Sequence, residues 1–229
     1  MKFQRARSTA QIEERKEQIR EAAFELYQKG DLAAVTFTNI AKKTTFSRPT
    51  IYTYYKTREE ILLDCLRCGM IICRKELERR FLGRPLMTRA EYCHSLTDWV
   101  LTHKFPLRLY SIHHTQLEPQ SRYEMLVAFN RESFHTFAVF TPILNHHCPD
   151  NTAEDIAFYV ASLLFFFTSV YPLADPSPIQ LKAFEEAEPP FAVPPLEESI
   201  YRTLLALSSP LHFAADDKNI KNPPADSEK

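Results

Sequence analysis

Residues 45–60 read TFSRPTIYTYYKTREE and contain two helix starts in succession. Ser47 is a favourable N-cap, and Pro49 falls in the first helical turn, where its missing N–H costs nothing. Thr57 followed by Glu60 has the spacing of a capping box and begins a second helix. The first helix carries almost no apolar stripe, so most of it cannot be buried in a core. We expect a partner outside the chain to contact it.

The residues before this stretch complete a small helical unit. Helical spacing of apolar side chains, ended by Gly30, predicts a helix over about 13–29. A short helix capped by Thr36 follows, and a tight turn at 44–46 joins it to the helix that opens at Ser47. Two short helices joined by a tight turn form a helix-turn-helix arrangement.

The charge is unevenly distributed along the chain. Residues 1–84 hold 18 Lys and Arg against 11 Asp and Glu, so they carry +7, while 85–229 carry −8. A basic first third on an acidic body predicts that the first third binds a polyanion.

Several function classes are excluded by composition. The three glycines cannot build a glycine-rich phosphate loop, and neither a GxSxG nor an HExxH motif occurs. We therefore predict that the protein is not an enzyme and needs no cofactor. An odd number of cysteines and a polar N-terminus without an apolar signal region predict a cytoplasmic protein with free thiols.

The remaining sequence predicts further helices. Residues 88–171 read as three or four helices with breaks near Pro106, Pro119 and 146–149, and a last amphipathic helix spans about 196–207. Between them, 172–195 is a proline-rich loop with at most a short helix around 180–188. No strand pattern occurs, so we predict an all-α protein of about nine helices.

One segment has the composition of a membrane span. Residues 156–174 are uncharged, but they include Ser, Thr and Pro and have acidic flanks. We therefore expect a helix buried in a core or at a subunit interface, and no membrane.

The chemistry of the helix that opens at Ser47 fits DNA. Its N-terminus offers unpaired backbone N–H groups and a positive dipole end to a phosphate. Arg48 can bind guanine O6 and N7 with two hydrogen bonds. Thr50 and Thr53 offer short hydroxyls, while Tyr52, Tyr54 and Tyr55 can pack a ring and direct a hydroxyl at a phosphate, although Tyr55 is more easily explained by packing. Lys56 and Arg58 are cations placed for phosphate.

At these residues the sequence resembles the tetracycline-repressor (TetR) family of transcriptional regulators over about 13–65. The motifs that carry the resemblance are Ile19-Arg20-Glu21-Ala22-Ala23, Leu26-Tyr27, Gly30, Thr36-Phe37-Thr38-Asn39-Ile40-Ala41, Phe46 to Tyr55, and Lys56-Thr57-Arg58-Glu59-Glu60-Ile61-Leu62. Thr45 stands where the family usually has a turn glycine, Pro49 replaces a common glycine or alanine, and Arg58 replaces the usual phosphate-binding lysine.

The resemblance implies a two-domain protein. It places a three-helix, helix-turn-helix DNA-binding domain at 12–72 and a helical effector-binding and dimerisation domain at 73–212, and we expect a disordered tail at 213–229. The candidate DNA-binding residues are Thr36, Thr38, Ser47, Arg48, Pro49, Thr50, Tyr52, Thr53, Tyr54, Lys56 and Arg58.

The second domain is rich in aromatic residues. Such helices can enclose an apolar pocket, or they can form an ordinary aromatic core, and the resemblance favours a pocket for a small apolar or aromatic effector. The candidate ligand-binding residues are Trp99, Tyr110, His114, Glu118, Phe134, Phe137 and Phe166.

Histidines and cysteines leave an alternative open. His114 and Glu118 are spaced i, i+4 beside His113, and 146–148 (His-His-Cys) could complete a metal site in space. Surface or core histidines are the simpler interpretation, so we predict no metal. The C-x-x-C of Cys65 and Cys68 lies on a predicted helix, where two buried thiols are simpler than a zinc site or a thiol sensor.

The sequence therefore favours a regulator, most simply a repressor, that binds a palindromic operator in double-stranded DNA as a homodimer. The segments 156–171 and 196–207 are the candidate dimer interface, because the resembled family pairs two late helices of each subunit. One short recognition helix binds DNA weakly, and two of them, spaced by one turn of the DNA double helix, read a palindrome. The alternative is a metal- or thiol-sensing regulator or a small-molecule-binding helical module.

Overall fold

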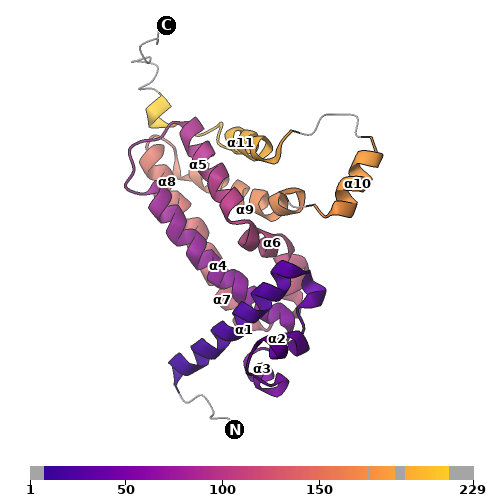
Figure 1. The fold of residues 1–229 in the computed structure, drawn as a ribbon. Coiled ribbons are helices and arrows are strands. Elements are labelled where there is room, and N and C mark those ends of the chain that lie inside the picture. The colour runs from indigo at the N-terminus through magenta and orange to yellow at the C-terminus, as the bar shows by residue number, and fades with distance from the viewer. Residues whose placement is uncertain (1–7, 175, 189–193, 217–229) are drawn as a thin grey trace, which may run out of the picture. The chain divides into compact units, whose positions relative to one another are not determined.

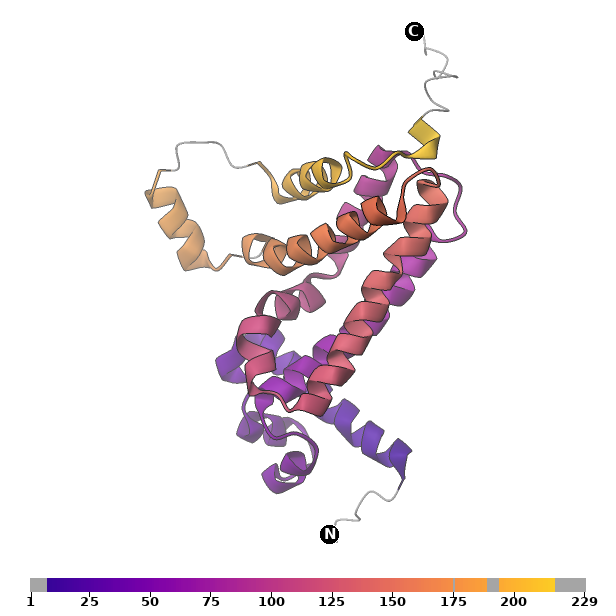
Figure 2. The ribbon, with the colours of Figure 1, turned by 180° about the vertical axis from the view of Figure 1, so that it is seen from behind.

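The computed structural model describes residues 8–174, 176–188 and 194–216 (Figures 1 and 2). They contain eleven α-helices and no strand, which confirms the all-α class. The helices are α1 Thr9–Lys29, α2 Phe37–Lys43, α3 Arg48–Tyr54, α4 Arg58–Phe81, α5 Arg89–Thr102, α6 Lys104–Ile112, α7 Tyr123–Ala138, α8 Phe140–His147, α9 Ala153–Ala174, α10 Pro178–Glu186 and α11 Leu196–Leu207, with short turns η1 Leu32–Ala34, η2 His113–Leu117 and η3 Glu118–Gln120.

The helices exceed the predicted nine for local reasons. Residues 88–171 hold five α-helices because Pro106 lies inside the first turn of α6, where proline is tolerated, and the break falls at His103 instead. The proline-rich loop contains α10, which Ser177 caps together with Gln180. At the other end, a capping box at Ser8 starts α1 earlier than expected.

The chain divides into two compact units. Unit 1 comprises residues 1–69 and 112–132, and unit 2 comprises 70–111 and 133–229. Both α4 and α7 begin in unit 1 and end in unit 2. The division of α4 lies close to the predicted boundary at 72/73, but the inclusion of 112–132 in unit 1 was not predicted.

Unit 1 contains the helix-turn-helix. The hydroxyls of Thr36 and Ser47 accept the backbone N–H of Asn39 and Thr50, and so cap α2 and α3 as predicted. The core side of the unit is fully buried and is formed by Ile19, Ala23, Val35, Ile40, Ile51, Tyr55, Ile61 and Leu62.

A buried carboxylate ties these helices together. Asp64 on α4 is 2% exposed and accepts hydrogen bonds from Tyr55 Oη at 2.6 Å, Arg20 Nη1 at 2.9 Å and Arg67 Nε at 2.7 Å. Burial raises the pKa of Asp64, but the charge of Arg67 and the hydrogen bond from Tyr55 outweigh it, so that the pKa lies below its usual value. The carboxylate thus joins α1, α4 and the residue that ends α3.

Unit 2 packs α11 against α5 and α8 against α9 around an aromatic core. Its packing extends past the predicted end of the domain. Phe213 is fully buried, with its ring centroid 5.3 Å from that of Tyr92, and Asp216 Oδ1 accepts the backbone N–H of Arg89. The predicted disordered tail was therefore wrong for 213–216, while its remaining residues, 217–229, lie outside the described residues.

Helix α9 leaves part of its apolar surface uncovered. It is long and apolar enough to cross a membrane by length and composition, and 28% of its most apolar window is buried. One stripe of the helix, marked by Phe158 and Phe165, is 71% and 78% exposed. Unit 2 alone therefore does not bury this helix on all sides.

Candidate nucleic-acid interface and apolar cavity

Helix α3 presents one polar face and one apolar face. Ile51 is fully buried, which fixes the helix against the rest of unit 1. Of the predicted residues in this stretch, Ser47, Arg48, Pro49, Tyr52 and Thr53 are exposed, and Thr50 and Tyr54 are half-buried. The N-terminal turn is well formed, because the hydroxyls of Ser47 and Thr50 lie 2.9 Å apart. The exposed face therefore carries a long guanidinium beside a helix N-terminus.

Tyr52 combines packing with exposure. Its ring stacks on Phe37 of α2, with 4.2 Å between centroids and 9° between planes, yet the residue remains 41% exposed. The stacking holds the tyrosine ring in one orientation across the two helices. Thr38 is exposed on α2, whereas the capping residue Thr36 is half-buried.

The two predicted phosphate-binding cations differ in their surroundings. Lys56 is exposed, and its Nζ donates to the carbonyl of Tyr52 at 3.0 Å, beside the C-terminal end of α3. Arg58 is half-buried, donates to the carbonyl of Leu32 at 2.9 Å and pairs with Glu59 at 2.9 Å. The geometry therefore gives Arg58 a bracing role inside unit 1, and its phosphate contact stays a prediction.

Arg122 contacts the end of α3, which the sequence did not reveal. Its Nε and Nη2 donate to the two carboxylate oxygens of Glu60 at 2.6 and 3.0 Å, and Nη2 also lies 3.3 Å from the carbonyl of Tyr54, the last residue of α3. Nearby, the Thr57 hydroxyl donates to the carbonyl of Gln120 at 2.9 Å. We call these contacts the Arg122–Glu60 clamp.

The clamp centres on a carboxylate that is completely buried. Glu60 is 0% exposed and also accepts the backbone N–H of Lys56 at 2.7 Å. Burial raises the pKa of Glu60, but hydrogen bonds from Arg122 and Lys56 outweigh it, so that the pKa lies below its usual value. The two partners are 62 residues apart in the chain, which explains why no local pattern predicted them.

In unit 2, aromatic side chains surround a small apolar cavity. Trp99, Tyr110 and Phe137, three of the predicted ligand-binding residues, line it together with Met70, Cys73, Leu77, Pro106, Leu107, Thr136, Phe140 and Phe167. The free space between them is about 20 Å³, which holds about one water molecule. The buried indole N–H of Trp99 has no hydrogen-bond acceptor among the described residues.

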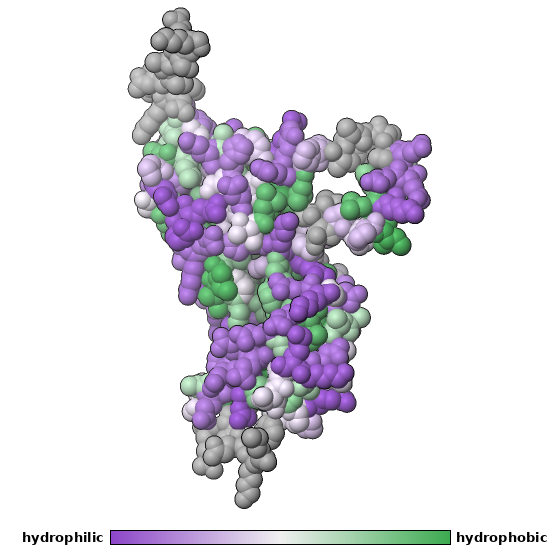
Figure 3. All heavy atoms as spheres, viewed as in Figure 1, coloured by the Kyte–Doolittle hydropathy of each residue, from purple (hydrophilic) through white to green (hydrophobic). Residues whose placement is uncertain are grey.

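The other predicted ligand-binding residues lie elsewhere. Phe134 on α7 is 69% exposed, and Phe166 lines an open groove of about 590 Å³ formed by α9, α10, α11 and the segments beside them. Figure 3 shows hydrophobic surface, in green, on both sides of this groove. His114 and Glu118 belong to unit 1. The predicted set is thus spread over four places, of which the cavity holds the largest share, three of the seven residues.

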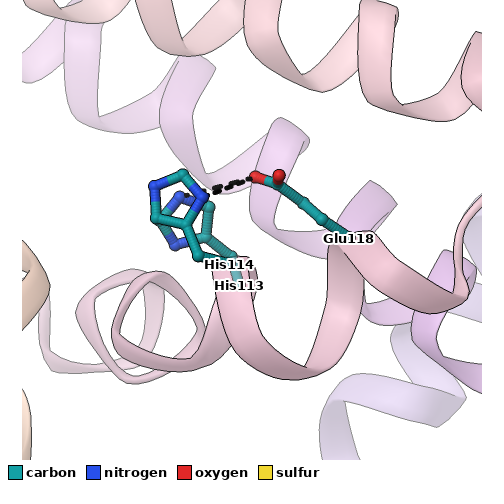
Figure 4. A group of neighbouring side chains, drawn as sticks. All are labelled: His113, His114 and Glu118. Atoms are coloured by element: carbon teal, nitrogen blue, oxygen red, sulfur yellow. Dashed lines mark ion pairs between the residues drawn. The ribbon is translucent and has the colours of Figure 1, made fainter.

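Two histidines and a glutamate form the one close group of metal-binding side chains within the part of the chain that the structure describes. The ligand atoms of His113, His114 and Glu118 all lie within 4.8 Å of one another (Figure 4). The second predicted group is arranged differently, because His147 Nδ1 accepts the backbone N–H of Met87 and His146 Nε2 lies 2.8 Å from the carbonyl of Arg84.

The cysteines have the surroundings of unreactive thiols. Burial raises the pKa of Cys65 and Cys68, and it raises the pKa of Cys73 and Cys148 to about 12. Because the thiolate is the reactive form, these side chains stay protonated near neutral pH. This result favours a structural role over a thiol sensor.

Comparison with known protein families finds a match for an N-terminal and for a C-terminal part of the chain. Residues 19–65 match the family described as "Bacterial regulatory proteins, tetR family", and residues 73–209 match "Tetracyclin repressor-like, C-terminal domain". The chain therefore belongs to the TetR family of transcriptional regulators, and its helix-turn-helix is a DNA-binding domain.

Solved structures support the same fold. A transcriptional regulator FadR from Bacillus subtilis, solved in complex with stearoyl-CoA, is 17% identical with a TM-score of 0.54, and the match covers 86% of this chain and 99% of that one. A putative regulator from Rhodococcus sp. RHA1 is 13% identical with a TM-score of 0.59, covering 89% and 98%. No curated protein matches the sequence. At these identities the likeness extends to the fold alone.

We predict that Arg122→Ala destabilises unit 1, because it leaves Glu60 buried without its main donor. The loss should be about 1–3 kcal/mol at pH 7, measured as a lower urea midpoint. The folded-state pKa of Glu60 lies below that of an unfolded glutamate, about 4.3. The clamp therefore stabilises fully above that pH, and the difference between wild type and variant should shrink as the pH falls through the folded-state pKa.

Arg202→Ala is the matched control. Arg202 pairs with Glu198 at 2.6 Å, but both side chains are exposed, so its removal should change the midpoint far less. Equal losses in the two variants would show that the clamp is an ordinary surface ion pair.

Proposed function

We propose that this protein is a transcriptional repressor that binds a palindromic operator in double-stranded DNA as a homodimer and responds to a small apolar effector. The observation that carries the proposal is helix α3, whose apolar side is locked into unit 1 while Arg48 and the N-terminal turn stay exposed. A DNA-binding regulator of this kind acts in the cytoplasm, and we propose no enzymatic activity.

The exposed face of α3 divides into base-reading and phosphate-binding parts. Arg48 reads a guanine, because a guanidinium matches the O6 and N7 acceptors in the major groove. The backbone N–H groups at the start of α3, the hydroxyl of Tyr52 and the ammonium of Lys56 bind phosphates and set the register. Base contacts therefore supply specificity, and phosphate contacts supply salt-dependent affinity.

We predict that Arg48→Ala weakens binding to the operator more than binding to random DNA, by about 1–3 kcal/mol of discrimination. Lys56→Ala should instead weaken both by a similar factor and flatten the salt dependence. Both affinities can be measured by fluorescence anisotropy, with a duplex from the DNA upstream of the gene and a scrambled duplex of the same length. Arg79→Ala, a 69% exposed arginine of unit 2, is the control. A uniform loss in Arg48→Ala would remove the base-reading role.

The exposed stripe of α9 is the proposed centre of the dimer interface. Phe158 and Phe165 share one face of α9, and the buried Tyr159, Leu163 and Phe167 lie on another. Exposed apolar patches of this kind mark association sites. Between the two phenylalanines the stripe carries only the small Ala161 and Ser162, which allows close approach of a second helix. Two recognition helices are needed because a half-site alone gives little affinity.

We predict that the double variant Phe158→Asp/Phe165→Asp is monomeric in light scattering after gel filtration, because two carboxylates would have to be desolvated in the interface. Ile72→Asp on α4 is the control, since Ile72 is 62% exposed outside α9, and this variant should stay dimeric. A dimer that survives the double substitution would move the interface away from this stripe.

The effector is proposed to occupy the cavity around Trp99. Its walls are apolar, and they include Trp99, whose buried indole N–H has no acceptor among the described residues. The 20 Å³ of free space means that an effector must separate the helices that line it. Coupling of this separation to α4, which begins in the DNA-binding unit, need supply only about 1–3 kcal/mol to regulate binding.

Trp99 is the sole tryptophan and therefore reports on its own cavity. We predict that stearoyl-CoA, the ligand of the similar FadR structure, shifts the Trp99 emission in a saturable way, because an acyl chain would replace protein contacts around the indole. Coenzyme A without an acyl chain is the control and should give no shift. An unchanged emission together with a raised melting temperature would place the ligand elsewhere, such as the groove beside α10.

A further inference from the structure

The turn η2 has a geometry that brings three metal-binding side chains together. It is a π-helical turn, in which the backbone N–H of Glu118 donates to the carbonyl of His113, five residues earlier. In an α-helix only the pair spaced i, i+4 would stack. The wider π turn also places the residue at i+5 on the same face, so that Glu118 meets both His113 and His114. Single π turns of this kind are frequent at functional sites.

The distances between the donor atoms suit a tetrahedral cation. Glu118 Oε1 lies 3.2 Å from His114 Nδ1 and 3.7 Å from His113 Nε2 (Figure 4). Two ligands held at about 2.1 Å from a tetrahedral zinc ion lie about 3.4 Å apart. His113 contributes Nε2 and His114 contributes Nδ1, and the two rings lie side by side with 3.8 Å between their centroids. One point in space is therefore within reach of all three donors.

One histidine of the group is buried and the other is exposed to solvent. His113 is 2% exposed and packs edge-on against Phe129, so its ring is held in place. His114 is exposed, which leaves the opposite side open to water. Glu118 Oε1 is buried and makes no hydrogen bond among the described groups, although it faces two ring nitrogens. The ring nitrogens can form an ion pair with this oxygen only when the imidazoles are protonated, and a bound cation would satisfy it with neutral imidazoles.

We propose that His113 Nε2, His114 Nδ1 and Glu118 Oε1 form a regulatory site for a divalent first-row cation, with zinc as the best-fitting ion and water as the fourth ligand. Mixed imidazole and carboxylate donors at these spacings suit Zn²⁺ better than Mg²⁺ or Ca²⁺, which prefer oxygen ligands in larger number.

The site is placed to act on the DNA-binding unit. Immediately after Glu118, Gln120 accepts from Thr57, and Arg122 holds Glu60 and the carbonyl that ends α3. All of these residues belong to unit 1. A cation that orders 113–118 also orders the segment that carries the Arg122–Glu60 clamp, so part of the ordering cost of binding DNA is met beforehand. This regulatory part rests on the proposed DNA-binding function, whereas the metal site does not.

The test of the site uses the full-length protein, first stripped with a chelator and then titrated with Co²⁺. We expect one ion per chain, the intense visible d–d bands of tetrahedral cobalt, and displacement by Zn²⁺. His114→Ala and Glu118→Gln, both on the open side, should lower affinity at least about tenfold. His146→Ala is the control for a surface histidine outside the group and should bind as wild type.

The outcomes separate the site from its regulation. Absence of the cobalt bands, unchanged affinity in His114→Ala and Glu118→Gln, or loss in His146→Ala would overturn the site. For the regulatory part, Zn²⁺ should tighten operator binding on the order of tenfold in wild type and not in His114→Ala. Zinc binding without any change in operator affinity would overturn the coupling. If no operator binding occurs at all, the proposed function fails, and the cobalt titration still decides the site.

Discussion

The buried carboxylates of Glu60 and Asp64, one turn apart on α4, are the constraint on which the DNA-binding unit depends. Helix α3 has only seven residues, and a helix of that length is not stable in isolation. Its position is held because Asp64 binds the hydroxyl of Tyr55 just beyond its end, while Glu60 binds Lys56 and the Arg122 that reaches Tyr54. Buried charges are costly unless they are fully paired, and both of these are.

This arrangement explains why α3 can expose so polar a face. The attachment of the helix uses Ile51, its caps, its C-terminal carbonyls and the stacking of Tyr52 on Phe37, and none of these needs the side chains of Arg48 or Thr53. The face that carries the predicted DNA-binding residues is therefore exposed. Because the clamp draws Arg122 from 62 residues further along the chain, the orientation of α3 depends on a segment outside the helix-turn-helix itself.

Unit 2 buries its aromatic side chains unevenly. Its core closes around Trp99, Phe137 and Phe167 with little free space, yet α9 keeps a phenylalanine stripe outside that core. A long apolar helix read from sequence alone fits a core or a subunit interface equally well, once its polar residues and acidic flanks argue against a membrane. Only the packing of α9 against α8 and α11 shows which of its faces remains uncovered. The same limit applied to the predicted ligand-binding residues, since aromatic composition does not say which rings share a cavity.

The sequence by itself determined the features that are encoded within a helical turn or two. It predicted the caps at Thr36 and Ser47, the place of Pro49, the bounds of the last helix at Leu196–Leu207 and the family, because each rests on neighbouring residues. Tertiary structure alone decided the Arg122–Glu60 clamp, the burial of Phe213 and the π turn that joins His113 to Glu118. These depend on contacts between distant segments or on a small change in helical winding, and neither leaves a periodic pattern in the chain.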